Sequence, residues 1–308
     1  MVIRLNPQYP VVWRTPDSLQ IGIDRPLTVV SHVSTSLERV VNLLRVGLPR
    51  GSIGMMGREV GATDDELAAL LQALRPALIA TGEDRIDEAG SPTEPAPASA
   101  AAPHTLVCVD GVGPTADGIA RSVAGLGIPV RAASPFDSFS GESSDDTTQR
   151  HYSAVAVLVG HYAFDPRRHG RWLRRDIPHL PVLFGDSDVH IGPFVEPGAG
   201  PCLYCVELHR IDLDPAWPAI AYQLSDRLAP TETARVSMDV AALVSGIVAD
   251  RVETGRSEFE AVSLTLDAAT GQITRRAHLP HAHCGCRALS GIASVPAGRA
   301  DRDPMPTS

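Results

Sequence analysis

The chain contains no lysine, and all 27 of its basic side chains are arginines. Reactions that need a lysine ammonium, such as formation of a Schiff base, are therefore excluded, and so is any phosphate site that depends on a lysine. Positive charge is not in excess either. The formal net charge of −9 argues against a general nucleic-acid binder.

Long apolar runs are also absent. No stretch approaches the 18 or more apolar residues of a membrane span, and the N-terminus MVIRLNPQYP has no apolar signal segment. We therefore expect a cytoplasmic protein without a membrane partner. The 44% content of hydrophobic residues supports a substantial core, and 308 residues suffice for two domains.

Cysteine is scarce, and four of the five cysteines form two pairs near the end of the chain. Cys202 and Cys205 make a C-x-x-C, and Cys284 and Cys286 make a C-x-C. Four thiolates with no open coordination position are typical of a structural zinc site. Either His281 or His283 could replace one sulfur. A disulfide, a redox C-x-x-C and unrelated core cysteines are the alternatives, although the reducing cytosol favours a metal.

The first 80 residues predict a small winged-helix-like α+β domain. Residues 11–30 have the pattern of a β-hairpin, and apolar stripes at helical spacing predict helices over 36–47 and 62–80. Thr63 is a good N-cap for the second helix. No basic stripe marks that helix as a DNA reader, so we expect peptide binding or dimerisation, with a purely structural scaffold as the alternative.

Composition divides the rest of the chain. Residues 81–104 are rich in Pro, Ala, Ser and acids, which predicts a flexible linker, and a disordered tail is expected over 293–308. Between them, residues 105–292 predict an α/β domain whose first strand, glycine turn and helix resemble a Rossmann-like unit. Its glycines at 111, 113 and 118 depart from G-x-G-x-x-G, and a tight β–α turn explains them equally well.

Four features together resemble the ThiF/ubiquitin-activating-enzyme superfamily. They are the strand–glycine–helix start, the PHLPV strand, the segment GPFVEPGAGPCLYC and the late second cysteine pair. GPCLYCVELHRIDLDPAWPAIAYQL and the HAHCGC ending are more specifically similar to the ThiF-like partner proteins of thiazole/oxazole-modified peptide (TOMM, bacteriocin) biosynthesis. The resemblance implies a degenerate Rossmann-like ThiF fold with structural zinc, preceded by a winged-helix-like peptide clamp.

Active members of that superfamily adenylate a carboxyl group with Mg-ATP. The resemblance places a vestigial nucleotide site at Gly111, Gly113 and Arg121. The lysine of the active members has no counterpart, and Gly160-His161-Tyr162 stands where their magnesium-binding aspartate is expected; Asp165 is a substitute several residues on. Losing both groups removes electrostatic stabilisation from a phosphate. No catalytic residue and no bound ATP are therefore expected.

The resemblance thus implies a non-catalytic scaffold. It would bind the leader of a ribosomally made precursor peptide and present it to a YcaO-type cyclodehydratase; an active adenylating enzyme is the alternative. Whether the chain forms a homodimer stays open. We expect the leader to add a strand to the edge of the hairpin near residues 19–24. The candidate contacts for this peptide are Leu19, Ile21, Ile23, Leu37 and Val41.

Overall fold

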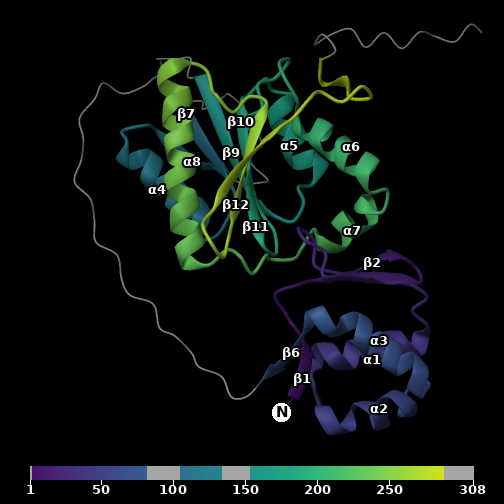
Figure 1. The fold of residues 1–308 in the computed structure, drawn as a ribbon. Coiled ribbons are helices and arrows are strands. Elements are labelled where there is room, and N and C mark those ends of the chain that lie inside the picture. Colours follow the sequence, from purple (N-terminus) through teal and green to yellow (C-terminus); the bar gives the residue numbers. More distant parts are fainter. Residues whose placement is uncertain (1, 82–104, 134–152, 288–308) are drawn as a thin grey trace, which may run out of the picture.

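A computed structural model describes residues 2–81, 105–133 and 153–287. The expected linker, apart from Thr81, and the expected tail lie outside these residues. Two units are visible in Figure 1: an N-terminal unit in purple and blue, and a larger α/β unit in teal to yellow.

The N-terminal unit combines two three-stranded antiparallel sheets with three helices. The sheet orders are β2-β3-β4 and β5-β1-β6. The elements are β1 (Val2–Leu5), β2 (Val11–Thr15), β3 (Ser18–Ile21), β4 (Thr28–Val30), α1 (Thr35–Val46), β5 (Leu48–Pro49), α2 (Ile53–Glu59), α3 (Asp64–Leu74) and β6 (Leu78–Thr81).

Local sequence explains both long helices of this unit. In α1 the side chain of Ser34 caps the first turn, and the apolar stripe predicted from the sequence is buried. In α3 the Thr63 side chain accepts a hydrogen bond from the Glu66 N–H, and the Glu66 carboxylate accepts one from the Thr63 N–H. The predicted N-cap is therefore confirmed, and it is half of a capping box.

The α/β unit is built on a seven-stranded sheet of order β13-β12-β11-β10-β9-β7-β8. The strands from β8 to β10 in that order are parallel, and β11, β12 and β13 are antiparallel additions. The elements are β7 (Thr105–Asp110), α4 (Pro114–Gly125), β8 (Val130–Ala133), β9 (Ser153–His161), α5 (Pro166–Leu173), β10 (His179–Phe184), β11 (Asp188–Ile191), α6 (Leu203–Leu213), α7 (Trp217–Leu224), α8 (Ala234–Thr254), β12 (Val262–Asp267) and β13 (Ile273–Ala277).

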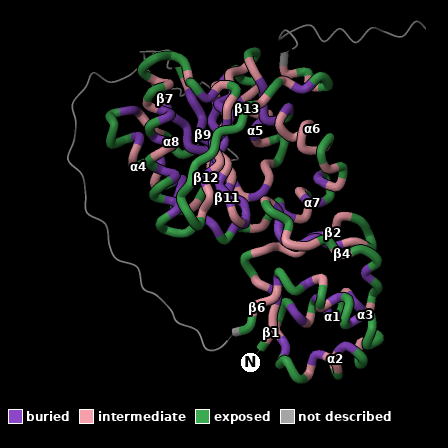
Figure 2. Tube along the Cα trace, in the orientation of Figure 1, coloured by how far each residue is buried: buried purple, intermediate pink, exposed green. Residues whose placement is uncertain are grey.

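Helices cover both faces of this sheet, as expected of a Rossmann-like α/β fold (Figure 1). Alternate residues of β7 and β9 divide between the faces. Val107 and Val157 belong to the core shared with α4 and α8, whereas Cys108 and Leu158 pack with Trp172 of α5. Both sets are fully buried, and Figure 2 shows the buried stretches gathered on these central strands.

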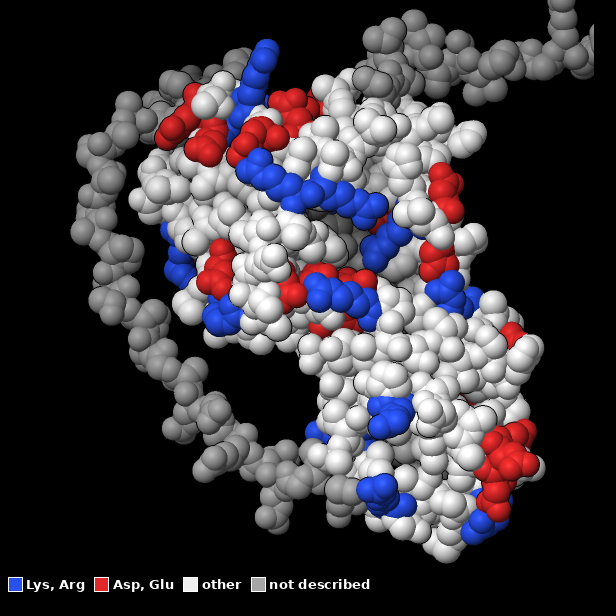
Figure 3. All heavy atoms as spheres, in the orientation of Figure 1, with Lys and Arg blue, Asp and Glu red and all other residues white. Residues whose placement is uncertain are grey.

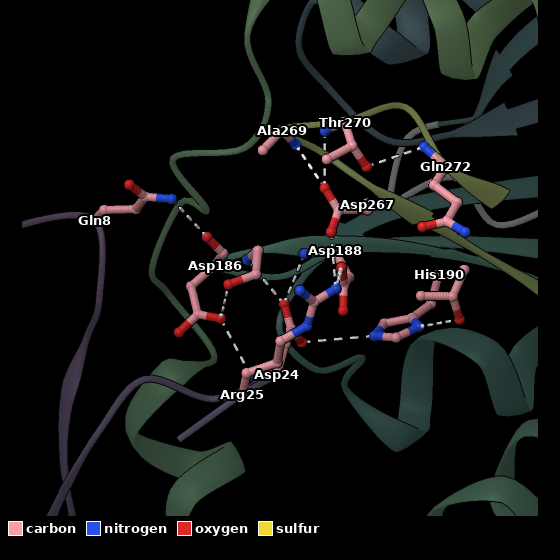
Figure 4. Close-up of polar contacts among 12 residues, drawn as sticks. Gln8, Asp24, Arg25, Asp186, Asp188, His190, Asp267, Ala269, Thr270 and Gln272 are labelled. Atoms are coloured by element: carbon pink, nitrogen blue, oxygen red, sulfur yellow. Dashed lines mark hydrogen bonds and ion pairs between the residues drawn. The ribbon is translucent and has the colours of Figure 1, made fainter. Parts of the chain in front are cut away.

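Paired charges join the two units. The carboxylate of Asp186 accepts hydrogen bonds from the N–H groups of Ile23 (2.6 Å) and Asp24 (3.1 Å). Arg25 reaches Asp188 at 2.7 Å and Asp267 at 2.9 Å, as Figure 4 shows. Burial and the nearby Asp24 carboxylate raise the pKa of Asp186 to about 6. The connection between β3 and β4 is therefore held against the carboxyl end of β10.

Some elements differ from the prediction. The segment SMDVAALVSGIVADRVETG predicts a helix capped by Ser237. This helix, α8, instead begins at Ala234 and is capped by Thr233, because the Thr233 hydroxyl accepts a hydrogen bond from the Val236 N–H. The sequence pattern also missed β1, β5, β6, α6 and α7. The segment EAVSLTLDAATGQITRRAHLP predicts a hairpin that turns at Thr270-Gly271, and the pairing of β12 with β13 confirms it. No helix in the described part of the chain is long and apolar enough to cross a membrane.

Candidate functional site

The two cysteine pairs meet, as the sequence predicts. Cys202 is the N-cap of α6 and Cys205 lies in its first turn, so one helix start presents both sulfurs. Their Sγ atoms are 3.8 Å apart; Cys202 lies 3.6 Å from Cys284, and Cys205 lies 3.5 Å from Cys286. None of the four is in a disulfide. The first turn of α6 is thus joined to the segment that follows β13.

These separations fit a tetrahedral ion. With metal–sulfur bonds of about 2.3 Å, the edge of a tetrahedron of thiolates is about 3.8 Å. Burial raises the pKa of the Cys202 thiol, and burial with hydrogen bonds to neighbouring sulfurs raises that of Cys286 to about 11. A bound cation would offset this burial cost and keep both sulfurs as thiolates. The four cysteines could therefore hold a metal ion.

The two nearby histidines do not take a cysteine's place in this cluster. The His281 Nε2 atom lies 2.8 Å from a carboxylate oxygen of Asp212, and its Nδ1 accepts a hydrogen bond from the His283 N–H. His209, Asp212 and His281 also come within metal-binding distance of one another. However, an imidazole that accepts at Nδ1 carries its proton on Nε2, and a histidine ligand needs a free lone pair there. Hydrogen bonding therefore accounts for this second group.

The glycine turn follows β7, where the resemblance places the nucleotide. A Cβ atom at Gly111 would lie 2.8 Å from the Val159 side chain, so close packing of β7 on β9 requires this glycine. Gly113 has φ of 107° and precedes the first turn of α4. A tight turn thus accounts for both glycines, and the N-terminus of α4 is left as the place where an anion would bind.

A carboxylate of the chain itself occupies that place. Glu232 Oε1 accepts a hydrogen bond from the Thr115 N–H at 3.2 Å, and the Glu232 carboxylate would lie 3.3 Å from a Cβ at Gly113. The other oxygen, Oε2, is 3.4 Å from His161 Nε2. Burial lowers the pKa of His161, and Glu232 counteracts the shift. A fixed negative charge therefore stands where a phosphate would interact with the helix.

Two arginines at this end of the sheet, Arg168 and Arg171, are paired with a carboxylate. Asp110 is fully buried, and its carboxylate lies 3.0 Å from Arg168 Nε, 2.9 Å from an Arg171 nitrogen and 2.8 Å from Trp172 Nε1. Arg168 also donates to the carbonyl oxygen of Val159. These guanidinium groups complete a buried network, which leaves little of their hydrogen-bonding capacity for a ligand.

Arg121 is not brought to the glycines, because it is exposed in the second half of α4. Asp165 does lie in the lining of a cavity of about 350 Å³ beside Gly111, but its carboxylate accepts from the Arg167 N–H as the N-cap of α5. Asp110 and Asp226 line the same cavity. The lining has three carboxyl groups against the two arginines Arg168 and Arg227, and the excess of negative charge opposes the entry of a triphosphate.

The five residues predicted to bind a peptide are all in the core. Leu19, Ile21, Ile23, Leu37 and Val41 are each less than a tenth exposed. The predicted edge near 19–24 is wrong, because β3 pairs with β2 on one side and with β4 on the other. The backbone groups of a central strand are used by its two neighbours, so no further strand can join there.

The two outer strands of this small sheet differ. On β2, the Gln223 side chain of α7 accepts from the Trp13 N–H and donates to the Trp13 carbonyl, so that edge is covered. On β4, no pairing beyond β3 is present among the described residues, and the side chain of Val29 is 47% exposed. α3 packs beside β4. The open edge is therefore β4, with α3 as the adjacent wall.

Comparisons with known proteins found similar solved structures only. No family model and no curated protein matches the chain. An Escherichia coli microcin synthetase McbBCD complex contains a chain with a TM-score of 0.43 and 12% identity, covering 93% of this chain and 100% of that one. E. coli MccB aligns at a TM-score of 0.41 and 10% identity over 95% and 98% of the two chains.

A third similar structure is a heterocyclase in complex with substrate and cofactor, with a TM-score of 0.41 and 13% identity, covering 92% of this chain and 39% of that one. Microcin synthetase and heterocyclase are the class of proteins that the cysteine segments resemble. Similarities this distant assign no role to any residue. The function has to be argued from the side chains of this chain.

Proposed function

We propose that this chain is a non-catalytic, zinc-stabilised ThiF-like scaffold of thiazole/oxazole-modified peptide biosynthesis. It binds the leader of a precursor peptide and presents that peptide to a YcaO-type cyclodehydratase. The observation that carries the non-catalytic part is the Glu232 carboxylate at the N-terminus of α4. The resemblance of the cysteine segments supports the biosynthetic context.

The charges around the glycine turn support the absence of adenylation. Adenylating enzymes stabilise the charge on ATP with cations and backbone N–H groups aimed at the phosphates. Here Glu232 takes the N–H of Thr115, and Asp110 takes Arg168 and Arg171. A triphosphate would have to displace two carboxylates, and the chain has no lysine to favour the exchange.

The open edge of β4 supports peptide binding. An extended leader can add to β4 as a fourth strand, with its backbone paired to Thr28–Val30 and its side chains against α3. This mode needs an unpaired strand edge beside a wall, and it replaces the contact set predicted around β3. Of the core residues expected to touch the peptide, Leu19 and Ile21 pair with β4 instead.

In this proposal a metal ion in the cysteine cluster stabilises the α/β unit of the scaffold. Four thiolates at tetrahedral spacing favour zinc among the common biological cations, because thiolate ligands select it over oxygen-seeking ions. In this proposal the zinc joins the start of α6 to the segment after β13 and takes no part in a reaction.

Calorimetric titration of the zinc-loaded protein with Mg-ATP tests the non-catalytic assignment. We expect no heat of binding up to millimolar nucleotide. Micromolar binding would overturn this assignment and support the alternative, an adenylating enzyme that uses the cavity beside Gly111.

Two proline substitutions test the leader site. Successive residues of a strand direct their N–H groups to opposite sides, so of Val29→Pro and Val30→Pro one removes an outward N–H and the other an inward one. Binding of a labelled leader peptide is expected to fall about tenfold or more in the outward variant, with the melting temperature nearly unchanged. If both variants bind as well as the wild type, the peptide does not add to β4.

A further inference from the structure

A second cavity lies on the other half of the sheet, and the proposed function makes no use of it. It has a volume of about 360 Å³ and is enclosed by β10–β13, the helix α6 and the connection between β3 and β4. Figure 3 shows a hollow in this part of the α/β unit, with arginine side chains along its border. The volume is at the lower end of the range for small-molecule sites, which is about 300–1,000 Å³.

The floor of this cavity is polar although α6 covers it. On β11 and β12, His190, Ser263 and Thr265 face the cavity, whereas the alternate residues Val189 and Leu264 belong to the core under α8. His190 pairs with Thr265 across the two strands, and the Ser263 hydroxyl lies 2.7 Å from His278 Nε2. A sheet face buried only for packing would be apolar, so these residues indicate a space that a polar group enters.

Two arginines face this space without a carboxylate partner. Arg210 of α6 and Arg276 of β13 line the cavity, and within the described residues neither side chain has a hydrogen bond or an ion pair. Arg210 stacks on the Trp217 ring, with its guanidinium carbon 3.4 Å from the ring centroid. Burial lowers the pKa of Arg210; Glu207 and Asp24 counteract this, and Arg276 lowers it further. The half-buried charge of Arg210 thus lies near a like charge, that of the exposed residue Arg276.

The two carboxylates in the lining are engaged elsewhere. Glu207 accepts a hydrogen bond from Trp217 Nε1 at 2.6 Å. Asp24 accepts from the N–H groups of Ser187 and Asp188, each at 3.0 Å, and lies 3.5 Å from His190 Nε2, as Figure 4 shows in part. Neither acid turns to Arg210 or Arg276 within hydrogen-bond distance. The unmet charge in the cavity is therefore positive and belongs to two guanidinium groups.

We propose that this cavity binds a small organic monocarboxylate, with the carboxylate between Arg210 and Arg276 and the apolar remainder against Leu203, Val206 and Leu183. Planar guanidinium groups match a carboxylate with paired, charge-assisted hydrogen bonds. A phosphate dianion fits less well, because Asp24 and Glu207 border the same space and would repel its second charge. The inference is independent of the leader site on β4.

The test is a titration of the full, metal-loaded chain with monocarboxylates of increasing size, from acetate through benzoate to N-acetyl-phenylalanine. Each acid is compared with its neutral amide, which has the same shape without the charge. Ligand-observed NMR and calorimetry should detect at least one acid of the series binding about tenfold or more tightly than its amide. Inorganic phosphate should bind more weakly than that acid.

Three variants locate the site. Arg276→Gln and Arg210→Gln should each weaken the acid about tenfold or more and leave its amide unaffected. Arg275→Gln is the matched control, since Arg275 is the neighbouring residue on β13, is 61% exposed and pairs with Glu258 outside the cavity. Arg275→Gln should bind as the wild type does. Melting temperature and metal content confirm that each variant is folded.

Three results would overturn the proposal. The first is a series in which no acid binds better than its amide. The second is binding that survives both Arg210→Gln and Arg276→Gln in folded protein. The third is a preference for inorganic phosphate over every carboxylate, which would leave an anion site but refute a carboxylate ligand.

Discussion

Two cavities of the α/β unit have nearly equal volumes, about 350 Å³ beside the glycine turn and about 360 Å³ under α6, but their charged side chains are paired differently. Beside the glycine turn, Asp110 pairs with Arg168 and Arg171, and Glu232 accepts a hydrogen bond at the N-terminus of α4. Under α6, Arg210 and Arg276 have no such partners among the described residues. Two cavities of similar size can therefore differ in whether the chain's own side chains already neutralise the charges that would bind a ligand.

The two cavities differ in the free-energy cost of leaving each one without a ligand. A buried charge without a partner destabilises the folded protein unless a ligand or water compensates. In the network around Asp110 the charges are already paired within the protein, so a bound ligand would add little stabilisation. In the cavity under α6 the half-buried Arg210 retains this cost, whereas Arg276 is exposed, and a bound anion can relieve the cost at Arg210. Four substitutions, in order of expected effect, can break or sharpen this comparison.

Loss of the metal should have the largest effect and should fall on one cavity only. Cys205→Ser removes a thiolate from the cluster that fixes the start of α6, the helix that covers the second cavity. We expect loss of the bound metal and of carboxylate binding, because structural zinc contributes about 10 kcal/mol or more in small domains. Metal analysis and calorimetry measure both. Retained carboxylate binding without metal would separate α6 from the cysteine cluster.

Asp110→Ala tests the paired cavity. Removing this carboxylate leaves Arg168 and Arg171 buried without their partner, which should lower the free energy of unfolding by about 3–5 kcal/mol. Urea titration measures the change. Asp250→Ala, at an exposed position of α8, is the control and should stay within about 0.5 kcal/mol of the wild type. Equal effects in the two variants would mean that the Asp110 network contributes no special stability.

Glu232→Gln tests whether a carboxylate substitutes for a phosphate at α4. Removing the negative charge from this helix N-terminus should lower the free energy of unfolding by about 1 kcal/mol. Inorganic phosphate or sulfate should then restore part of the lost stability in the variant and have no such effect on the wild type. An identical response of both proteins to these anions would rule out an anion position behind Glu232.

His278→Gln should change the pH dependence of stability. Burial, and then the charge of Arg276, lower the pKa of His278 to about 4, whereas an unfolded histidine titrates near 6.5. Between these values the unfolded state binds more protons, so His278 adds stability above about pH 6.5 that is lost as the pH falls through 4. Denaturant titrations should therefore show a shallower decline between pH 7 and 4 in the variant. Parallel profiles would contradict this contribution.

Sequence patterns predicted what depends on neighbours along the chain. The stripe of α1, the Thr63 cap and the terminal hairpin follow from local periodicity and capping chemistry. The cysteine pairs could also be predicted to meet, because thiols at such spacings have few other uses. The sequence predicts the wrong edge for the small sheet, because β4 has only three residues and no clear alternation, so the pattern indicates β3 as the edge.

The missed site residues depend on contacts between distant segments. Glu232 caps a helix that starts more than a hundred positions earlier, and no local pattern marks it as a cap. The alternation of β12 reads as a strand with one solvent-exposed face, and only the position of α6 turns Ser263 and Thr265 into a cavity floor. Arg210 gave no signal on α6, because an arginine on a helix is usually solvated.

The cysteine cluster also bears on the order in which the chain folds. Cys202 and Cys284 are 82 positions apart, and the segment between them contains α6, α7, α8, β12 and β13. Closing so long a loop has a large entropic cost until those elements have packed. The first pair can hold an ion with two sulfurs at most, and the other two arrive only after the terminal hairpin has formed. Acquisition of the four-sulfur site should therefore be one of the last steps of folding, so its rate reports when the α/β unit is complete.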